Sequence, residues 1–152
     1  MEIKLWVNKK VYQDNIEPDM LLIDYLRSKG FYSVKRGCET SNCGLCTVHL
    51  DGKPILSCNT LALKANGKHV TTLEGMEEEV EEFACFMADE GAEQCGYCSP
   101  GFVMNVLAMR EELVNPSEEE IKNYLAGNLC RCTGYMGQLR AVKKFLNSTK
   151  EV

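Results

Sequence analysis

The stretch Cys38-Glu-Thr-Ser-Asn-Cys43-Gly-Leu-Cys46 places three cysteines close together, and Cys58 follows after eleven further residues. The spacing C-x4-C-x2-C-x11-C is the plant-type arrangement for a [2Fe–2S] cluster. We therefore predict that this cluster is bound by Cys38, Cys43, Cys46 and Cys58. The alternative is structural zinc, but zinc ribbons usually pair two C-x2-C knuckles, and only Cys43 and Cys46 form one here.

A second set of cysteines lies in the C-terminal half, as Cys95-Gly-Tyr-Cys98 and Cys130-Arg-Cys132. By itself this set fits zinc and iron–sulfur equally well; beside the first set, a second [2Fe–2S] cluster is favoured. A thioredoxin-like interpretation of Cys95 and Cys98 requires a βαβ context, which the sequence does not predict, and leaves Cys130 and Cys132 unexplained. The ninth cysteine, Cys85, is predicted to be a buried free thiol.

Composition and charge narrow the possible functions. The 152 residues carry a net charge of −5, with ten basic against eight acidic residues in 1–76 and seven against fourteen in 77–152. This is not the basic footprint of a nucleic-acid-binding protein. No apolar run is long enough to span a membrane and no secretory signal is visible, so we expect a cytoplasmic protein. Clustered cysteines in that compartment indicate metal binding rather than disulfides.

The N-terminal half predicts strands and one helix. Alternating apolar residues predict a hairpin of Glu2–Val7 and Lys10–Ile16, and Asp51-Gly52 predicts a second hairpin of Thr47–Leu50 and Lys53–Leu56. A helix over Met20–Ser28, capped by Asp19 and ended by Gly30, separates the hairpins, and His69–Leu73 is a further strand. This order of elements predicts an α+β fold.

After Gly75 the pattern predicts only helices. The predicted helices are Glu77–Glu90, one that Ser99 caps and Pro100 opens, one from the Ser117–Glu120 capping box to Gly127, and Met136–Asn147. We place a domain boundary near residue 76, which divides the chain into 1–76 and 77–152. The sequence shows no Ser/His/Asp group, acid pair or phosphate-binding loop, so no catalytic residues are predicted.

The segments around the second cysteine set carry a resemblance to a known family. They are Glu93-Gln-Cys-Gly-Tyr-Cys-Ser-Pro-Gly-Phe-Val-Met104 and Leu125-Ala-Gly-Asn-Leu-Cys-Arg-Cys-Thr-Gly-Tyr135. With Leu26–Cys58, they strongly resemble the small iron–sulfur subunit of the xanthine dehydrogenase family of molybdenum hydroxylases, over essentially the whole chain. The resemblance implies a ferredoxin-like β-grasp domain followed by a four-helix domain, each holding one [2Fe–2S] cluster.

The resemblance also implies partners. A large subunit would bind a molybdopterin cofactor and hydroxylate the substrate, and a medium subunit would bind FAD. The helical-domain cluster would then lie nearer molybdenum, and the Cys38–Cys58 cluster nearer flavin. Gln94 matches the family glutamine that hydrogen-bonds the pterin, since an amide can both donate and accept there. The alternative for Gln94 is an exposed glutamine at a helix end.

The first cysteine loop departs from the family pattern C-G-x-G-x-C-G-A-C. Glu39, Ser41 and Leu45 replace the two glycines and the alanine. We expect ligation to be retained and Asn42 to supply the positive φ that a lost glycine would have supplied. The cluster's hydrogen bonds, its potential and the contact with the flavin subunit should differ, and Glu39 adds a negative charge that lowers the potential.

These observations predict a non-catalytic electron-transfer subunit of a molybdenum hydroxylase, in a dimer of heterotrimers. A xanthine or purine dehydrogenase is the first choice. Nicotinate, aldehyde, carbon monoxide and aromatic acyl-CoA enzymes of the family have similar small subunits, so the substrate stays open. Two other functions stay open as well: a free-standing ferredoxin-like carrier and a zinc-stabilised binding module.

Overall fold

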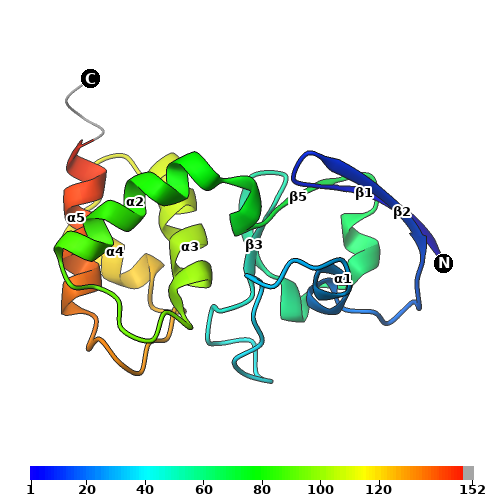
Figure 1. Ribbon diagram of the computed structural model, residues 1–152, viewed down its shortest axis with the longest axis horizontal. Coiled ribbons are helices and arrows are strands. Elements are labelled where there is room, and N and C mark those ends of the chain that lie inside the picture. Colours follow the sequence, from blue (N-terminus) through cyan, green and yellow to red (C-terminus); the bar gives the residue numbers. More distant parts are fainter. Residues whose placement is uncertain (149–152) are drawn as a thin grey trace.

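The computed structural model describes residues 1–148, so residues 149–152 of the predicted helical domain lie outside the described residues. Figure 1 shows the sheet at one end of the molecule and the C-terminal helices at the other. The strands are β1 (Glu2–Val7), β2 (Lys10–Asn15), β3 (Thr47–Leu50), β4 (Lys53–Leu56) and β5 (His69–Thr71). The α-helices are α1 (Leu22–Ser28), α2 (Glu77–Asp89), α3 (Ser99–Glu112), α4 (Glu118–Tyr124) and α5 (Met136–Ser148).

The five strands form one mixed sheet in the order β2-β1-β5-β3-β4. The central pair, β1 and β5, is parallel, and the other neighbouring strands are antiparallel. The β3–β4 hairpin turns at Asp51 and Gly52, whose φ angles are 50° and 81°. A two-residue hairpin turn with two positive φ angles is what an Asp-Gly pair favours. The sheet and its helix confirm the predicted α+β class.

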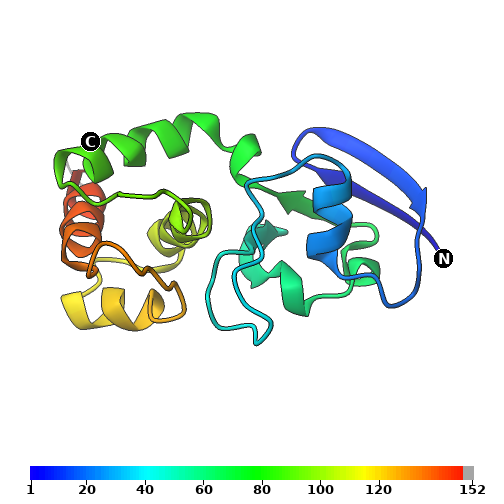
Figure 2. The same ribbon diagram turned by 60° about the horizontal axis from the view of Figure 1, so that its bottom comes forward.

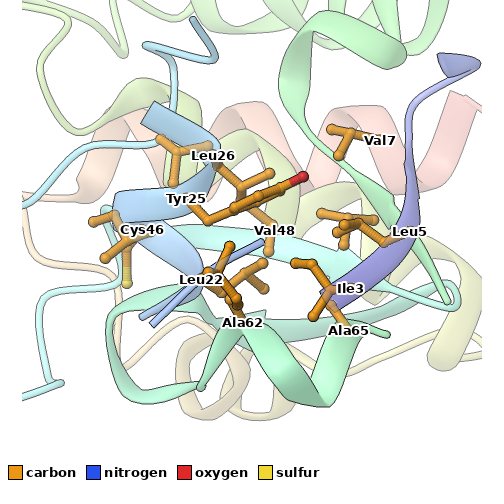
Figure 3. Packing of buried hydrophobic residues seen from close by; sticks show 14 residues of the cluster. Ile3, Leu5, Val7, Leu22, Tyr25, Leu26, Cys46, Val48, Ala62 and Ala65 are labelled. Atoms are coloured by element: carbon orange, nitrogen blue, oxygen red, sulfur yellow. The ribbon is translucent and has the colours of Figure 1, made fainter. Parts of the chain in front are cut away.

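The first hydrophobic core lies between α1 and the sheet. Side chains alternate along β1, so that Ile3, Leu5 and Val7 point inward. Leu22 and Leu26 of α1 pack against them and are fully buried. Figure 3 shows this packing and places Cys46 in the same core. A cysteine of the first set is therefore part of the apolar interior of the β half.

The second hydrophobic core lies among the four C-terminal helices. Phe83 of α2 packs on Phe102 of α3 and on Phe145 of α5, with ring centroids 6.1 and 4.9 Å apart. The capping box at the start of α4 is confirmed: Ser117 and Glu120 bond each other's backbone N–H through their side chains. The second half is therefore the predicted group of four helices around its own core.

Several predicted element ends are wrong, including the following four. Helix α1 begins at Leu22 without a side-chain cap from Asp19, because Leu21 is extended and bridges Leu61. The N-cap of α3 is Cys98; Ser99 is already helical, and its hydroxyl donates to Glu93. Strand β5 ends at Thr71 because Thr72 N–H turns to the side chain of Asn8. Helix α4 ends at Tyr124, before the predicted Gly127.

The two halves meet where β3 faces α3. His49 is buried, and its Nε2 lies 2.8 Å from the carbonyl oxygen of Met104, which accepts the hydrogen bond. Gly101 approaches the first cysteine loop so closely that an added Cβ would overlap the carbonyl oxygen of Gly44. Figure 2 shows the loop before β3 and the loop before α5 facing each other beside this junction. The contact between the halves thus combines a buried side-chain hydrogen bond with a close approach of the backbone at Gly101.

We expect Gly101→Ala to lower the free energy of unfolding by about 1–3 kcal/mol, because the methyl group overpacks the junction. Because alanine otherwise favours a helix over glycine by about 1 kcal/mol, a loss of stability in this variant can be attributed to the clash. Urea unfolding of both chains measures the change. Gly127→Ala is the matched control, since nothing lies within 4 Å of its added Cβ; an equal loss in both variants would contradict the close approach.

Candidate iron–sulfur centres

The first cysteine set lies on the loop between α1 and β3 and on the 3₁₀ turn Ser57–Asn59. Its four thiols form two hydrogen-bonded pairs: Cys38 with Cys43, and Cys46 with Cys58. Cys43 and Cys46 are buried, and the other two are half-buried. A two-iron cluster takes two thiolates on each iron, so two adjacent pairs are the donor arrangement that it needs.

The loop around the first set is tight. An added Cβ at Gly37 would lie 2.7 Å from the end of the Leu45 side chain and 3.3 Å from the Sγ of Cys43, so a side chain there would displace Leu45. Gly44 has a φ of +75°. The positive φ expected at Asn42 is wrong: Ser41 adopts it, with a φ of 57°. Ser41 stands where the family pattern has a glycine, the residue that adopts a positive φ most readily.

The first-set thiols have very different acidities. Backbone N–H groups of Asn42 and Thr40 hydrogen-bond the sulfur of Cys38 and lower its pKa to about 6. Burial raises the pKa of Cys43, and it raises that of Cys46 to about 11. Thiolates, not thiols, bind metal. Cys38 is therefore ready to bind at neutral pH, whereas Cys46 must lose a proton when it binds.

The second cysteine set joins the loop before α3 to the loop between α4 and α5. The Sγ of Cys132 lies 3.5 Å from that of Cys95, and Cys98 pairs with Cys130. Cys95 and Cys132 are exposed, and the other two are half-buried. Thr133 Oγ1 donates to the Sγ of Cys130 at 3.2 Å. This set again offers two pairs of thiols, but it opens to the surface.

In the second set, too, hydrogen bonds and burial shift the pKa values of the thiols. A hydrogen bond from the backbone N–H of Tyr97 lowers the pKa of Cys95, and burial raises that of Cys98 to about 11. The hydrogen bond to Cys95 raises the pKa of Cys132.

Both sets fit two irons better than one metal ion. A structural zinc needs four ligands around one ion, whereas each iron of a [2Fe–2S] cluster takes only two cysteines. The paired thiols therefore favour the cluster over zinc in each set.

Cysteines of both sets line one hollow of about 530 Å³ between the two halves. Two of the hydrogen bonds that cross this region involve residues next to the cysteines. Leu129, next to Cys130, donates its N–H to the carbonyl oxygen of Cys43 at 2.9 Å. Tyr97, between Cys95 and Cys98, donates its hydroxyl to the carbonyl oxygen of Arg36 at 3.2 Å. The two cysteine sets are thus neighbours although they are far apart in sequence.

Cys85 and Gln94, the two other residues discussed in the sequence analysis, are both exposed. Cys85 is exposed, so the prediction of a buried thiol is wrong. It lies two residues from both Phe83 and Met87, the buried residues of α2, and therefore points to the opposite face. Gln94 is exposed beside the exposed Cys95. None of the helices in residues 1–148 has the length and apolar character needed to cross a membrane.

Comparisons with known proteins assign both cysteine sets to iron–sulfur domains. Residues 7–69 match the family model of a 2Fe-2S iron-sulfur cluster binding domain, and residues 72–143 match that of a [2Fe-2S] binding domain. The nicotinate dehydrogenase small FeS subunit of Eubacterium barkeri is 40% identical over 145 residues, which cover 93% of this chain and 92% of that protein.

Two further relatives support the same family. The xanthine dehydrogenase iron-sulfur-binding subunit of Escherichia coli O157:H7 is 43% identical over 88% of this chain and 86% of its own. The crystal structure of quinoline 2-oxidoreductase from Pseudomonas putida 86 superposes with a TM-score of 0.90, at 35% identity, over 99% of this chain and 96% of that one. The chain belongs to the iron–sulfur small subunits of the molybdenum hydroxylases.

This iron–sulfur subunit has a ferredoxin-like β-grasp half and a helical half, both of [2Fe–2S] type. It is a non-catalytic subunit of an oxidoreductase. Ligation by the eight cysteines, the pterin contact of Gln94 and the domain boundary near residue 76 stay predictions. Sequence reasoning missed Gly101 and Asn128 at the junction between the sets; their places within the motifs that hold Cys98 and Cys130 were the available signal.

In the cluster-free subunit, we expect Cys38 to react with iodoacetamide with a pH midpoint near 6, because only its thiolate is nucleophilic. Cys46 and Cys98 should stay unlabelled at neutral pH, since their pKa is about 11. Mass spectrometry of the labelled peptides across pH measures this. Labelling after unfolding in guanidinium is the control and should follow the ordinary cysteine pKa of about 8.5. A midpoint near 8.5 for Cys38 in the folded chain would contradict the expectation.

Proposed function

We propose that this subunit carries electrons between a molybdopterin site on a large partner subunit and FAD on a medium partner subunit. Cys95, Cys98, Cys130 and Cys132 would hold the cluster on the molybdenum side, and Cys38, Cys43, Cys46 and Cys58 the one on the flavin side. Each bound cluster would supply a one-electron carrier. The observation that carries the proposal is the arrangement of eight thiols as paired donors in two adjoining sites.

The exposure of the second set supports a partner on that side. Cys95, Cys132 and Gln94 are exposed, so a cluster bound there would face water in the isolated chain. Tyr135 and Met136 close by are 46% and 57% exposed, an unusual cost for large apolar side chains unless a partner covers them. A covering subunit would exclude water from the cysteines and bring Gln94 within reach of a pterin.

The first set depends less than the second on a partner subunit for shielding from water. Cys43 and Cys46 are buried within this chain, and the loop's outer edge carries Glu39, whose side chain is 79% exposed and 3.5 Å from Arg36. Of these two charged side chains, only Glu39 stands where the family pattern has a glycine. We propose that they contact the flavin subunit and that the charge of Glu39 lowers the potential of the adjoining cluster.

A xanthine or purine dehydrogenase remains our proposal for the whole enzyme, as a cytoplasmic dimer of heterotrimers. The relative from Escherichia coli supports xanthine, and the relative from Eubacterium barkeri supports nicotinate as the second candidate. The chain offers no choice between them, because substrate recognition belongs to the large subunit. A free-standing carrier is the rival function, and the exposed face of the second set argues against it.

Anaerobically purified protein should contain about four iron and four sulfide per chain, because each [2Fe–2S] cluster holds two of each. Metal analysis and acid-labile sulfide assays measure this. Zinc in place of iron would overturn the proposal and support a zinc-stabilised binding module.

Cys130→Ser should remove one of two [2Fe–2S] signals in electron paramagnetic resonance and about half of the iron, because it disrupts only the second set. Cys85→Ser is the matched control: this exposed thiol lies outside both sets, so both signals should persist. Loss of both signals in Cys130→Ser, or of one in Cys85→Ser, would contradict the assignment.

Purification from the native source should recover the chain with two larger subunits, molybdenum and FAD, because a partner subunit must shield the exposed second set from water. Activity of that complex with xanthine and with nicotinate decides between the two substrates. A chain recovered alone with both clusters would favour the free-standing carrier.

A further inference from the structure

Asn128 is a buried polar residue with no role in the sites described above. It is 6% exposed. Its Oδ1 accepts a hydrogen bond from Nδ2 of Asn105 on α3, and its own Nδ2 donates to the carbonyl oxygen of Gly101 at 3.3 Å. An amide has one accepting and one donating end, so the two partners fix its orientation. A buried amide with both ends satisfied holds its surroundings rigidly.

The same amide stands where three cysteine-bearing segments meet. Gly44 directly follows a cysteine of the first set, Gly101 lies three residues after a cysteine of the second, and Asn128 lies two residues before another. A Cβ on Gly44 would lie 2.5 Å from Nδ2 of Asn128, and one on Gly101 would overlap the carbonyl oxygen of Gly44. No spare volume separates these segments, so a change in the amide moves them relative to one another.

The residue after Asn128 makes the direct backbone link between the two sets. Leu129 donates its N–H to the carbonyl oxygen of Cys43, and Cys130 follows Leu129 in the chain. Asn128 anchors this short segment to α3 from one side while Cys43 holds it from the other. The distance between the two sets therefore depends on how firmly the amide is held.

We propose that Asn128 is a positioning residue that sets the separation of the two cysteine sets, and thereby the coupling between the groups they bind. This rests on the proposed function, since it requires a cluster in each set. A purely structural asparagine would stabilise the fold without affecting that coupling. The two roles predict different results for a conservative substitution.

The test is Asn128→Asp in the full-length chain loaded with iron and sulfide. The carboxylate still accepts from Asn105, but it cannot donate to Gly101 and repels that carbonyl oxygen. We expect unchanged iron and sulfide content and both paramagnetic signals, with a smaller dipolar splitting between the two reduced clusters. The splitting decreases because dipolar coupling falls with the cube of the distance.

Asn123→Asp, the same change at an exposed position of α4, is the matched control and should keep the original splitting. A splitting unchanged in Asn128→Asp, even with a lower melting temperature, overturns the inference. If Asn128→Asp does not take up both clusters, the second variant to test is Asn105→Ala, which removes only the hydrogen-bond donor to Oδ1 of Asn128. A reduced dipolar splitting in Asn105→Ala supports the inference, and an unchanged splitting overturns it. An unmodified chain without two [2Fe–2S] signals overturns the proposed function itself, and this inference with it.

Discussion

The structure depends on a contact between bare backbones. A side chain on Gly101 would overlap the carbonyl oxygen of Gly44, and a side chain on Gly44 would overlap the amide of Asn128 and the carbonyl oxygen of Gly127. Steric exclusion at this point forces the β half and the helical half into one relative position. The paired cysteines lie on the segments that leave this junction, so their mutual placement follows from a packing constraint rather than from the metal chemistry alone.

The two cysteine sets lie in opposite environments. The first is built into a hydrophobic core, where Cys46 packs with the side chains of α1 and β1. The second lies at the rim of the helical half, where Cys95 and Cys132 face solvent. Burial within this chain shields the first set, whereas in the proposed enzyme a partner subunit would shield the second. One chain would thus combine a largely self-contained site with a site that a partner subunit completes.

Local signals predicted most of the fold, and distant contacts explain where prediction failed. The Asp51-Gly52 turn and the Ser117 capping box are determined within a few residues, so the sequence was sufficient for them. The start of α1 depends on the bridge from Leu21 to Leu61, which no local pattern reveals. The exposed Cys85 is a different case: its spacing from Phe83 and Met87 places it on the opposite face of α2, and the prediction of a buried thiol neglected that local pattern. For the sites, spacing predicted which cysteines come together, but not which sets would be buried.

The burial of Cys46 has a consequence for biosynthesis. This thiol is 2% exposed and its pKa is raised to about 11, so in the closed core it neither meets an incoming iron nor readily gives up its proton. For a cluster held by this set, insertion must precede the closure of α1 over the sheet or reopen it. The helical set, at the surface, carries no such restriction. A cluster in the first set would thus need an open or reopened core for its insertion, whereas one in the second set would not.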